Sequence, residues 1–418
     1  MKEQKIGKEE FFLLVGPAQF AVTSGAVEVI AARIGKGEKL NVPLGKRVPI
    51  RALEDTVLQV ECEPDKLTKM EGSSIPAEWD ALAKRVVGER RDGRLYSIVV
   101  LGEVDTGKTF FSTYIANRLL HHLKRTAILD CDTGQSDIGP PGTFGMLVMK
   151  KPVVFLTEEP ATYLYMLGAH SPGLHFLPAL TGLAAMLEKA RADADALIID
   201  TTGWVQGDGG RAIKKSKLDI VNPDMVVLMQ RGTELEHLVK HLPKERVVRL
   251  PVSKKASSTS QMERKSLREL VSVRYFKGAQ KMEIPFSRVF TDRCYFLTGT
   301  PLTLDGALHA ERLSAWEGSL AVTAKPLTPD VSKGWPKEIG RVTNFVAGDE
   351  KGLMVGLLDD KQNCLAIARL DEIDFAKKCF RLRTPFSGSP EQVRGIQFGS
   401  LKLAEDGREA GFIEPGSI

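Results

Sequence analysis

The feature that most constrains the fold is a short glycine-containing segment, Gly102–Thr109, which reads Gly-Glu-Val-Asp-Thr-Gly-Lys-Thr. It matches the pattern Gly-x-x-x-x-Gly-Lys-Ser/Thr in full. The apolar run Ser97–Leu101 precedes it, and a helix-like stretch, 108–124, follows. In this setting the loop's backbone N–H groups point inward at phosphate oxygens, and the helix N-terminus adds positive charge. The alternative is a chance glycine turn, against which the flanking strand and helix argue.

This loop predicts a nucleoside triphosphate site with a bound cation. Lys108 is expected to reach the β- and γ-phosphates, and the Thr109 hydroxyl is expected to bind Mg²⁺. The cofactors predicted are therefore ATP and Mg²⁺. The residues expected to contact the nucleotide are Gly102, Glu103, Val104, Asp105, Thr106, Gly107, Lys108 and Thr109.

The pattern of apolar runs predicts an α/β protein with three parts. A chain of 418 residues exceeds the size of one hydrophobic core. Apolar, β-branched runs alternate with helical stretches in the middle of the chain, which predicts a mostly parallel sheet. We expect an N-terminal β domain (1–88), a central P-loop NTPase domain (89–282, with a basic lid at about 252–276) and a C-terminal β domain (283–418).

Several local predictions can be tested individually. Val27–Ala32 and Val153–Leu156 each read as one strand, and Arg288–Phe290 as another. Val48–Ile50 also reads as a strand, but Pro49 lacks an N–H donor and should confine it to a sheet edge. The stretch Gln261–Tyr275 reads as a helix.

Composition excludes several classes of protein. The five cysteines are scattered without metal-ligand spacing, which argues against a zinc site or a disulfide framework and suits a reducing compartment. No window approaches the uninterrupted apolar length of a membrane span, and the charged N-terminus lacks a signal-peptide core. We expect a cytoplasmic protein without a membrane partner.

Three aspartates follow apolar strands and are candidates for metal binding or proton transfer. Asp130 and Asp132 follow the run at 127–129, and Asp200 follows the run at 196–199. Open α/β sheets bind ligands at this edge, where a carboxylate can hold Mg²⁺ or accept a proton from a hydroxyl. For Asp130, a structural role in the loop is an equally good interpretation. Asp200 is a candidate outer-sphere ligand of Mg²⁺.

A basic segment follows the central strands. Residues 240–281 contain twelve Lys or Arg and three Asp or Glu, an excess larger than the net charge of +5 of the whole chain. Arg264 and Arg268 stand four apart on one helix face. Such a helix could close on the γ-phosphate, line a path for an anionic polymer or remain a solvated surface. Trp204 could pack between elements or stack on a nucleobase.

The order of these motifs resembles the polynucleotide 5′-hydroxyl kinase family, which includes the RNA kinases of messenger-RNA 3′-end cleavage, tRNA splicing and pre-ribosomal RNA processing. The resemblance rests on the P-loop with its internal aspartate, followed by Asp132–Gln135, Pro141–Thr143, Thr201–Trp204 and Asn222–Arg231. It is specific over about 96–280 and favours a prokaryotic member.

The resemblance implies a role for each matched residue. Asp132 would accept the proton of the 5′-hydroxyl and touch Mg²⁺, and Gln135 would contact the terminal phosphate of the substrate. Thr201, Gly203 and Trp204 would clasp the substrate end, and Arg264 would reach the transferring phosphoryl group. A second lid arginine of the family is replaced here by Thr259; Arg268 or Lys254 and Lys255 could substitute.

Together these features predict an ATP-dependent kinase that phosphorylates 5′-hydroxyl ends of RNA, DNA or both, with Asp132, Lys108 and Arg264 as catalytic residues. RNA-processing proteins are candidate partners. The alternatives are an ATP-binding scaffold without turnover and an ATPase that drives a conformational switch.

Overall fold

The computed structural model describes residues 2–253, 259–314 and 317–418. The chain forms two compact units. The first comprises Met1–Cys131, Met146–Thr162 and Ala184–Ser260, and the second comprises Asp132–Gly145, Tyr163–Leu183 and Gln261–Ile418. The chain passes between the units within β12 (Thr143–Met149) and within α3 (Phe176–Asp193). The division into residues 1–88, 89–282 and 283–418 remains a prediction.

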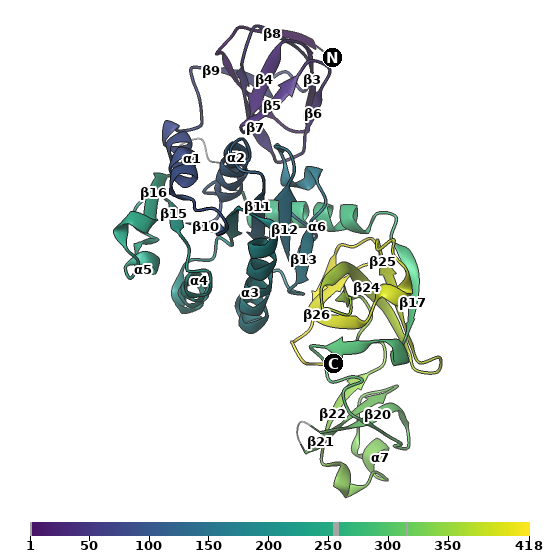
Figure 1. Cartoon of the computed structure of the whole chain (residues 1–418). Coiled ribbons are helices and arrows are strands. Elements are labelled where there is room, and N and C mark those ends of the chain that lie inside the picture. The colour runs from purple at the N-terminus through teal and green to yellow at the C-terminus, as the bar shows by residue number, and fades with distance from the viewer. Residues whose placement is uncertain (1, 254–258, 315–316) are drawn as a thin grey trace. The chain divides into compact units, whose positions relative to one another are not determined.

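The first unit begins with two β-sheets, of strand order β1-β8-β3-β6 and β5-β4-β7-β2-β9 (Figure 1). Alternating buried and exposed residues, as in β6, show strands with one face on a core. The strands are β1 (Lys2–Ile6), β2 (Phe11–Val15), β3 (Ala18–Ser24), β4 (Ala26–Val29), β5 (Ala32–Gly35), β6 (Lys39–Val42), β7 (Arg47–Ala52), β8 (Thr56–Glu61) and β9 (Leu67–Met70).

Two predictions for this region are wrong. The run Val27–Ala32 is not one strand, because Ile30 and Ala31 adopt positive φ angles of 50° and 59° and turn the chain from β4 into β5. The strand that contains Pro49 is not at an edge, since β7 lies between β4 and β2. The proline is tolerated because β4 pairs only with Arg51 and Ala52, so no N–H is needed on that side of Pro49.

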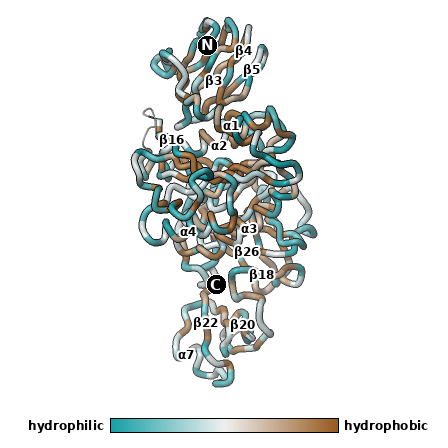
Figure 2. Tube along the Cα trace, turned by 60° about the vertical axis from the view of Figure 1, so that its left-hand side comes forward, coloured by the Kyte–Doolittle hydropathy of each residue, from teal (hydrophilic) through white to brown (hydrophobic). Residues whose placement is uncertain are grey.

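The rest of the first unit is built on a parallel sheet of strand order β16-β15-β10-β14-β11. All residues of its four longest strands are buried, as expected for a sheet covered on both faces. The strands are β10 (Tyr96–Gly102), β11 (Thr126–Cys131), β14 (Ala196–Thr201), β15 (Met225–Gln230) and β16 (Val247–Pro251), and the helices are α1 (Ala77–Glu89), α2 (Lys108–Leu120), α4 (Gly207–Val221) and α5 (Glu236–Val239). Figure 2 shows hydrophobic residues concentrated in the interior of these layers.

The predicted strand Val153–Leu156 is also wrong, because this segment is a loop that leads into a 3₁₀ turn. The buried side chain of Asn117 on α2 takes the place of a neighbouring strand. Its Nδ2 donates to the carbonyl oxygen of Val153 at 2.7 Å, and its Oδ1 accepts from the Val153 N–H at 3.0 Å. The backbone groups are thus satisfied without a β-ladder.

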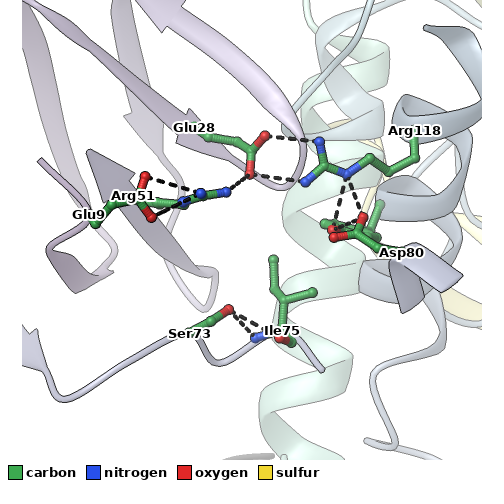
Figure 3. A network of polar contacts seen from close by, with 8 residues as sticks. Glu9, Glu28, Arg51, Ser73, Ile75, Asp80 and Arg118 are labelled. Atoms are coloured by element: carbon green, nitrogen blue, oxygen red, sulfur yellow. Dashed lines mark hydrogen bonds and ion pairs between the residues drawn. The ribbon is translucent and has the colours of Figure 1, made fainter. Parts of the chain in front are cut away.

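A polar network joins the N-terminal strands to α1 and α2 (Figure 3). Arg118 on α2 contacts Glu28 on β4 at 3.0 Å and Asp80 on α1 at 2.9 Å. Glu28 also lies 3.7 Å from Arg51 on β7, which pairs with Glu9. In addition, Asn117 Nδ2 donates to the Ile30 carbonyl oxygen at 2.6 Å. The N-terminal strands therefore hold the C-terminal half of α2.

The second unit contains α6 (Gln261–Phe276), which confirms the predicted helix, and strands around a core that includes Phe296, Leu370 and Phe380. Most of these strands pair antiparallel, whereas β18 pairs with β26, and β21 with β22, in parallel. The strands form two sheets, of order β13-β24-β23-β26-β18 and β19-β20-β21-β22. The elements are β13 (Tyr163–Met166), β17 (Gln280–Pro285), β18 (Phe290–Asp292), β19 (Thr300–Leu302), β20 (Ala307–Leu313), β21 (Gly318–Thr323), α7 (Pro329–Ser332), β22 (Arg341–Val346), β23 (Leu353–Leu358), β24 (Cys364–Asp374), β25 (Cys379–Thr384), β26 (Gly395–Leu403) and β27 (Glu409–Phe412).

The predicted strand Arg288–Phe290 begins two residues later than expected, because Phe286–Arg288 forms a 3₁₀ turn after Pro285. Across residues 2–253, 259–314 and 317–418, no helix combines the length and apolarity needed to cross a membrane.

Candidate nucleotide and substrate site

The P-loop has the predicted geometry. β10 ends at Gly102, α2 begins at Lys108, and the loop between them turns through left-handed residues Asp105 (φ 58°) and Gly107 (φ 85°). A Cβ atom at Gly102 would lie 2.9 Å from the carbonyl oxygen of Met229 on β15, so only glycine fits there. The backbone is therefore shaped for a phosphate chain, as the sequence predicted.

Lys108 and Thr109 lie at the start of α2, with their polar atoms near the loop and the sheet edge. Lys108 Nζ donates to the carbonyl oxygen of Glu103 at 2.7 Å, which folds the ammonium group back over the loop. Thr109 Oγ1 donates to Asp200 Oδ2 at 2.6 Å. The structure thus brings together two residues that lie far apart in the sequence and that were singled out separately.

This pair of oxygens fits a magnesium site. Asp200 is the penultimate residue of β14 and is paired in register with Asp130 on β11; each residue is 1% exposed. Mg²⁺ prefers hard oxygen ligands and is usually bound by one or two carboxylates together with substrate phosphates and water. The described residues contain no group of three or more His, Cys, Asp or Glu that could hold a metal alone. The donor set therefore suits a cation that arrives with its nucleotide.

The neighbouring Cys131 is not a candidate nucleophile. It is the last residue of β11 and is fully buried. Burial raises the pKa of its thiol to about 11, so the thiol stays protonated near neutral pH.

Asp132 follows β11 directly and shapes the loop after it. Its Oδ1 accepts hydrogen bonds from the N–H groups of Gly134 (3.0 Å) and Gln135 (3.1 Å). Asp132 is half-buried and Gln135 is exposed. Both residues belong to the second unit, whereas the P-loop belongs to the first. Their contacts with nucleotide and substrate remain predictions.

The segment Thr201–Trp204 lies against the P-loop. Thr201 Oγ1 donates to the carbonyl oxygen of Val100 on β10 at 2.8 Å. A Cβ atom at Gly203 would lie 2.6 Å from the backbone nitrogen of Val104, so a side chain there would displace the loop. Trp204 is half-buried, and its indole Nε1 lies 3.1 Å from the position a Cβ of Gly210 would take on α4. The indole thus packs on α4 while keeping part of its surface exposed.

Sequence reasoning missed one residue that fixes this segment. Lys214 on α4 is fully buried, and its Nζ donates to the carbonyl oxygen (2.5 Å) and the Oγ1 (3.0 Å) of Thr202. No helix was predicted at α4, which begins with the glycine-rich stretch Gly207–Gly210, so its lysines were not considered. A lysine at helical spacing among apolar residues was the signal available.

The lid residues fall into both units. In the first, Thr259 donates from its N–H to Asp105 Oδ2 at 2.7 Å and from its Oγ1 to Oδ1 at 3.3 Å. In the second, α6 carries Arg264 and Arg268, and the Arg268 guanidinium lies 3.8 Å from Glu409. Lys254 and Lys255 lie outside the described residues. The threonine that replaces the expected arginine is therefore bound to the aspartate inside the P-loop.

A second missed residue, Arg231, lies directly after β15 at the P-loop. Its Nη2 donates to the carbonyl oxygen of Asp105 at 3.4 Å, and its Nη1 lies 3.8 Å from Glu103. The side chain is about half exposed. It is an additional cation beside the phosphate-binding loop; it ends the segment Asn222–Arg231 that carries the family resemblance, but no role was predicted for it.

The fold and this site define a P-loop nucleotide-binding protein of the ATP-binding kinase class. Residues 102–278 match the family model described as the mRNA cleavage and polyadenylation factor CLP1 P-loop. The solved structure of a wild-type Clp1p–Pcf11p complex superposes with a TM-score of 0.68 at 14% identity, covering 96% of this chain and 97% of that chain. This likeness establishes the shared fold.

Relatives of known name extend the match well beyond the P-loop. The chain is 30% identical to a polyribonucleotide 5′-hydroxyl-kinase of Methanocaldococcus jannaschii, over 77% of this chain and 91% of that protein. It is 31% identical to one of Thermococcus kodakarensis (76% and 91%) and 29% identical to one of Pyrococcus furiosus (81% and 96%). The chain belongs to the polyribonucleotide 5′-hydroxyl-kinase family, and the predicted resemblance is confirmed.

Proposed function

We propose that this chain is an ATP-dependent kinase that transfers the γ-phosphoryl group to the 5′-hydroxyl end of RNA. The observation that carries the proposal is the convergence of Thr109, Asp200 and the Gly203 backbone on one phosphate-binding loop. It joins the elements expected to hold the triphosphate to the segment expected to hold the acceptor. The name shared by the relatives makes RNA the first acceptor to test, with DNA second.

The reaction requires positioning and charge neutralisation more than covalent chemistry. The acceptor 5′-oxygen bonds to the γ-phosphorus while the bond from that phosphorus to the β–γ bridging oxygen breaks and ADP leaves. Asp132 accepts the hydroxyl proton. Lys108 moves from Glu103 to the phosphate oxygens, and Arg264 neutralises charge on the transferred group.

Bound Mg²⁺, held by Thr109 directly and by Asp200 directly or through water, would supply further neutralisation of the β- and γ-oxygens. Asp132 is a further candidate ligand. Gln135, Thr201, Gly203 and Trp204 would hold the terminal nucleotide, with the exposed part of the Trp204 ring as a stacking surface for a base.

A labelling assay tests the proposal. We expect the full-length protein to transfer label from γ-labelled ATP to a 5′-hydroxyl RNA oligonucleotide, in parallel with DNA of the same sequence. Lys108→Ala should lower the rate roughly 10²–10³-fold through loss of transition-state stabilisation. Asp132→Asn should lower it roughly 10²–10⁴-fold through loss of the base. Asp137→Asn, a change in the same loop, serves as the matched control.

Each alternative gives a different result in this assay. Bound ATP without labelled oligonucleotide or released phosphate would identify a scaffold. Phosphate release without labelled oligonucleotide would identify an ATPase. Full activity of Asp132→Asn would remove the base assignment alone.

The structural neighbour was solved with a second protein, Pcf11p, so we also propose a protein partner for this chain, to be sought by co-purification.

A further inference from the structure

Three cations stand side by side across three strands of the second unit. In the antiparallel pairing, Lys281 on β17 lies directly opposite Arg383 on β25, and Arg383 lies directly opposite Arg369 on β24. Directly opposed residues share one face of a sheet, with Cβ atoms close enough to interact. Like charges in such positions destabilise the sheet. The row Lys281–Arg383–Arg369 therefore carries a cost that the fold has to offset.

The neighbouring row on the same face shows how the chain balances charge elsewhere. There Arg381 on β25 lies opposite Glu283 on β17 and Glu372 on β24, so that acidic, basic and acidic residues alternate. Arg381 makes ion pairs with both glutamates and with Asp374. One row is fully paired within the protein, and the row beside it is uniformly basic.

The basic row lines a cavity of about 410 Å³. Beyond that row, Lys351 and Glu405 reach the cavity from other segments, and Asp371 from the bulge in β24. The row of Glu283, Arg381 and Glu372 is neutralised within the protein. The remaining charged residues of the lining are four cations (Lys281, Lys351, Arg369 and Arg383) and two carboxylates (Asp371 and Glu405). The volume lies within the roughly 300–1,000 Å³ of small-ligand sites. The cavity belongs wholly to the second unit.

The bonding of these side chains leaves positive charge directed at the cavity. Arg369 donates through Nε to the carbonyl oxygen of Leu403 at 2.8 Å and pairs with Asp371, and its side chain is 7% exposed. Arg383 Nε lies 3.6 Å from Asp371, too far for a hydrogen bond, and is buried without a hydrogen-bond partner among the described residues. Lys281 and Lys351 form no ion pair within the described part of the chain. Asp371 is thus shared by two guanidinium groups.

The electrostatics point in the same direction. Burial lowers the pKa of the Arg369 guanidinium; Glu405 opposes this shift and Arg383 adds to it. Two guanidinium groups held together in a partly buried place are stabilised by an acceptor that can bond to both. Guanidinium groups bind carboxylates and phosphates, and a phosphate group has at least three acceptor oxygens with which to bond to both groups at once.

We propose that the cavity lined by Lys281, Lys351, Arg369 and Arg383 is a phosphate-binding site of the C-terminal β-sheet. Its ligand is a phosphate group, either of a small phosphate ion or ester or of a polynucleotide backbone. The site is separate in sequence from the P-loop and the Thr201–Trp204 segment, and it does not depend on the proposed kinase activity.

Thermal unfolding tests the site in the full-length Lys108→Ala protein, in which phosphate binding at the P-loop is weakened. At constant ionic strength, replacing chloride by inorganic phosphate should raise the melting temperature by roughly 2–4 °C. Arg383→Gln should abolish this rise. In phosphate-free buffer Arg383→Gln should also melt at a higher temperature than its parent, because a like-charge contact is removed. A purely structural role for Arg383 predicts the opposite sign.

Two further variants keep the test decisive. Lys281→Gln changes an exposed side chain, so the fold should survive, and it should also reduce the phosphate effect. Arg381→Gln in the adjacent row should lower the melting temperature in both buffers and keep the phosphate increment. Hydrogen exchange of peptides from β17, β24 and β25 should show that protection by phosphate is local.

A second arm identifies the source of the phosphate. A single-stranded RNA oligonucleotide replaces inorganic phosphate in the same series of variants. If Lys281→Gln and Arg383→Gln remove the stabilisation by one of the two ligands, the site is supported. The ligand whose effect is lost shows whether the site binds a phosphate ion or a polynucleotide. Equal stabilisation of the parent and both variants by both ligands would overturn it.

Discussion

Single residues of the site act through backbone contact as much as through their functional groups. Gly203 is the clearest case, because its Cα lies against Val104 of the P-loop. The segment that contains it was predicted from its motif to bind substrate, but the contact with the P-loop brings together residues about a hundred positions apart. Sequence spacing carries no information about such an approach.

The first prediction at this scale concerns that contact. Gly203→Ala should lower both ATP affinity and the phosphorylation rate, because a Cβ 2.6 Å from the Val104 nitrogen must displace the phosphate-binding loop. We expect a loss of roughly tenfold or more, consistent with the sensitivity of catalysis to small displacements. Binding of labelled ATP and the kinase rate measure the two effects. Gly232→Ala, after β15 and with no backbone within reach of a Cβ, is the matched control. Equal affinity in both variants would contradict the interpretation.

A second residue-scale prediction follows from the buried Lys214. Lys214→Met keeps the length of the side chain but leaves Thr202 without its donor, so the segment Thr201–Trp204 should lose its fixed position. The Michaelis constant for the oligonucleotide should rise while ATP binding changes little, because Lys214 holds Thr202 and not the P-loop. Steady-state kinetics with each substrate varied in turn would check this. A change confined to ATP binding would refute it.

At the scale of elements, α2 connects the phosphate site to the rest of the first unit. Its start at Lys108 could be predicted from the sequence, since a P-loop leads directly into a helix, but the predicted stretch 108–124 runs past its end at Leu120. The strand predicted at Val153–Leu156 failed because the carboxamide of Asn117 replaces a β-ladder, a tertiary contact that local pattern cannot reveal. The missed α4 begins with glycines, whose low helix propensity is overridden by packing.

Asn117 provides the prediction at this scale. Asn117→Ala should destabilise the protein by about 2–4 kcal/mol, because three buried backbone groups of Ile30 and Val153 lose their partner. Denaturant unfolding measures the change. Ser112→Ala on the same helix is the control: this hydroxyl is buried with no hydrogen-bond partner among the described residues, so its removal should cost little. Similar losses in the two variants would contradict the argument.

At the scale of the whole molecule, the sequence was sufficient to predict a parallel P-loop sheet flanked by β-sheets, because apolar runs with intervening helices have few other solutions. It was not sufficient to predict the row of basic residues across β17, β25 and β24. Lys281, Arg369 and Arg383 become neighbours only through the strand pairing of β17, β25 and β24. Long-range register of this kind is set by the fold and is not written in any local motif.

The contacts between the N-terminal strands and α2 have a consequence for how the protein responds to its nucleotide. One end of this helix begins at the P-loop, and its other half is bonded through Asn117 and Arg118 to the N-terminal β-sheets. Because both contacts are on one helix, an event that stabilises one end of α2 also stabilises the other. Saturating ATP should therefore slow proteolysis within the first seventy or so residues, although they lie outside the P-loop, and trimming those strands should weaken nucleotide retention by the same free energy.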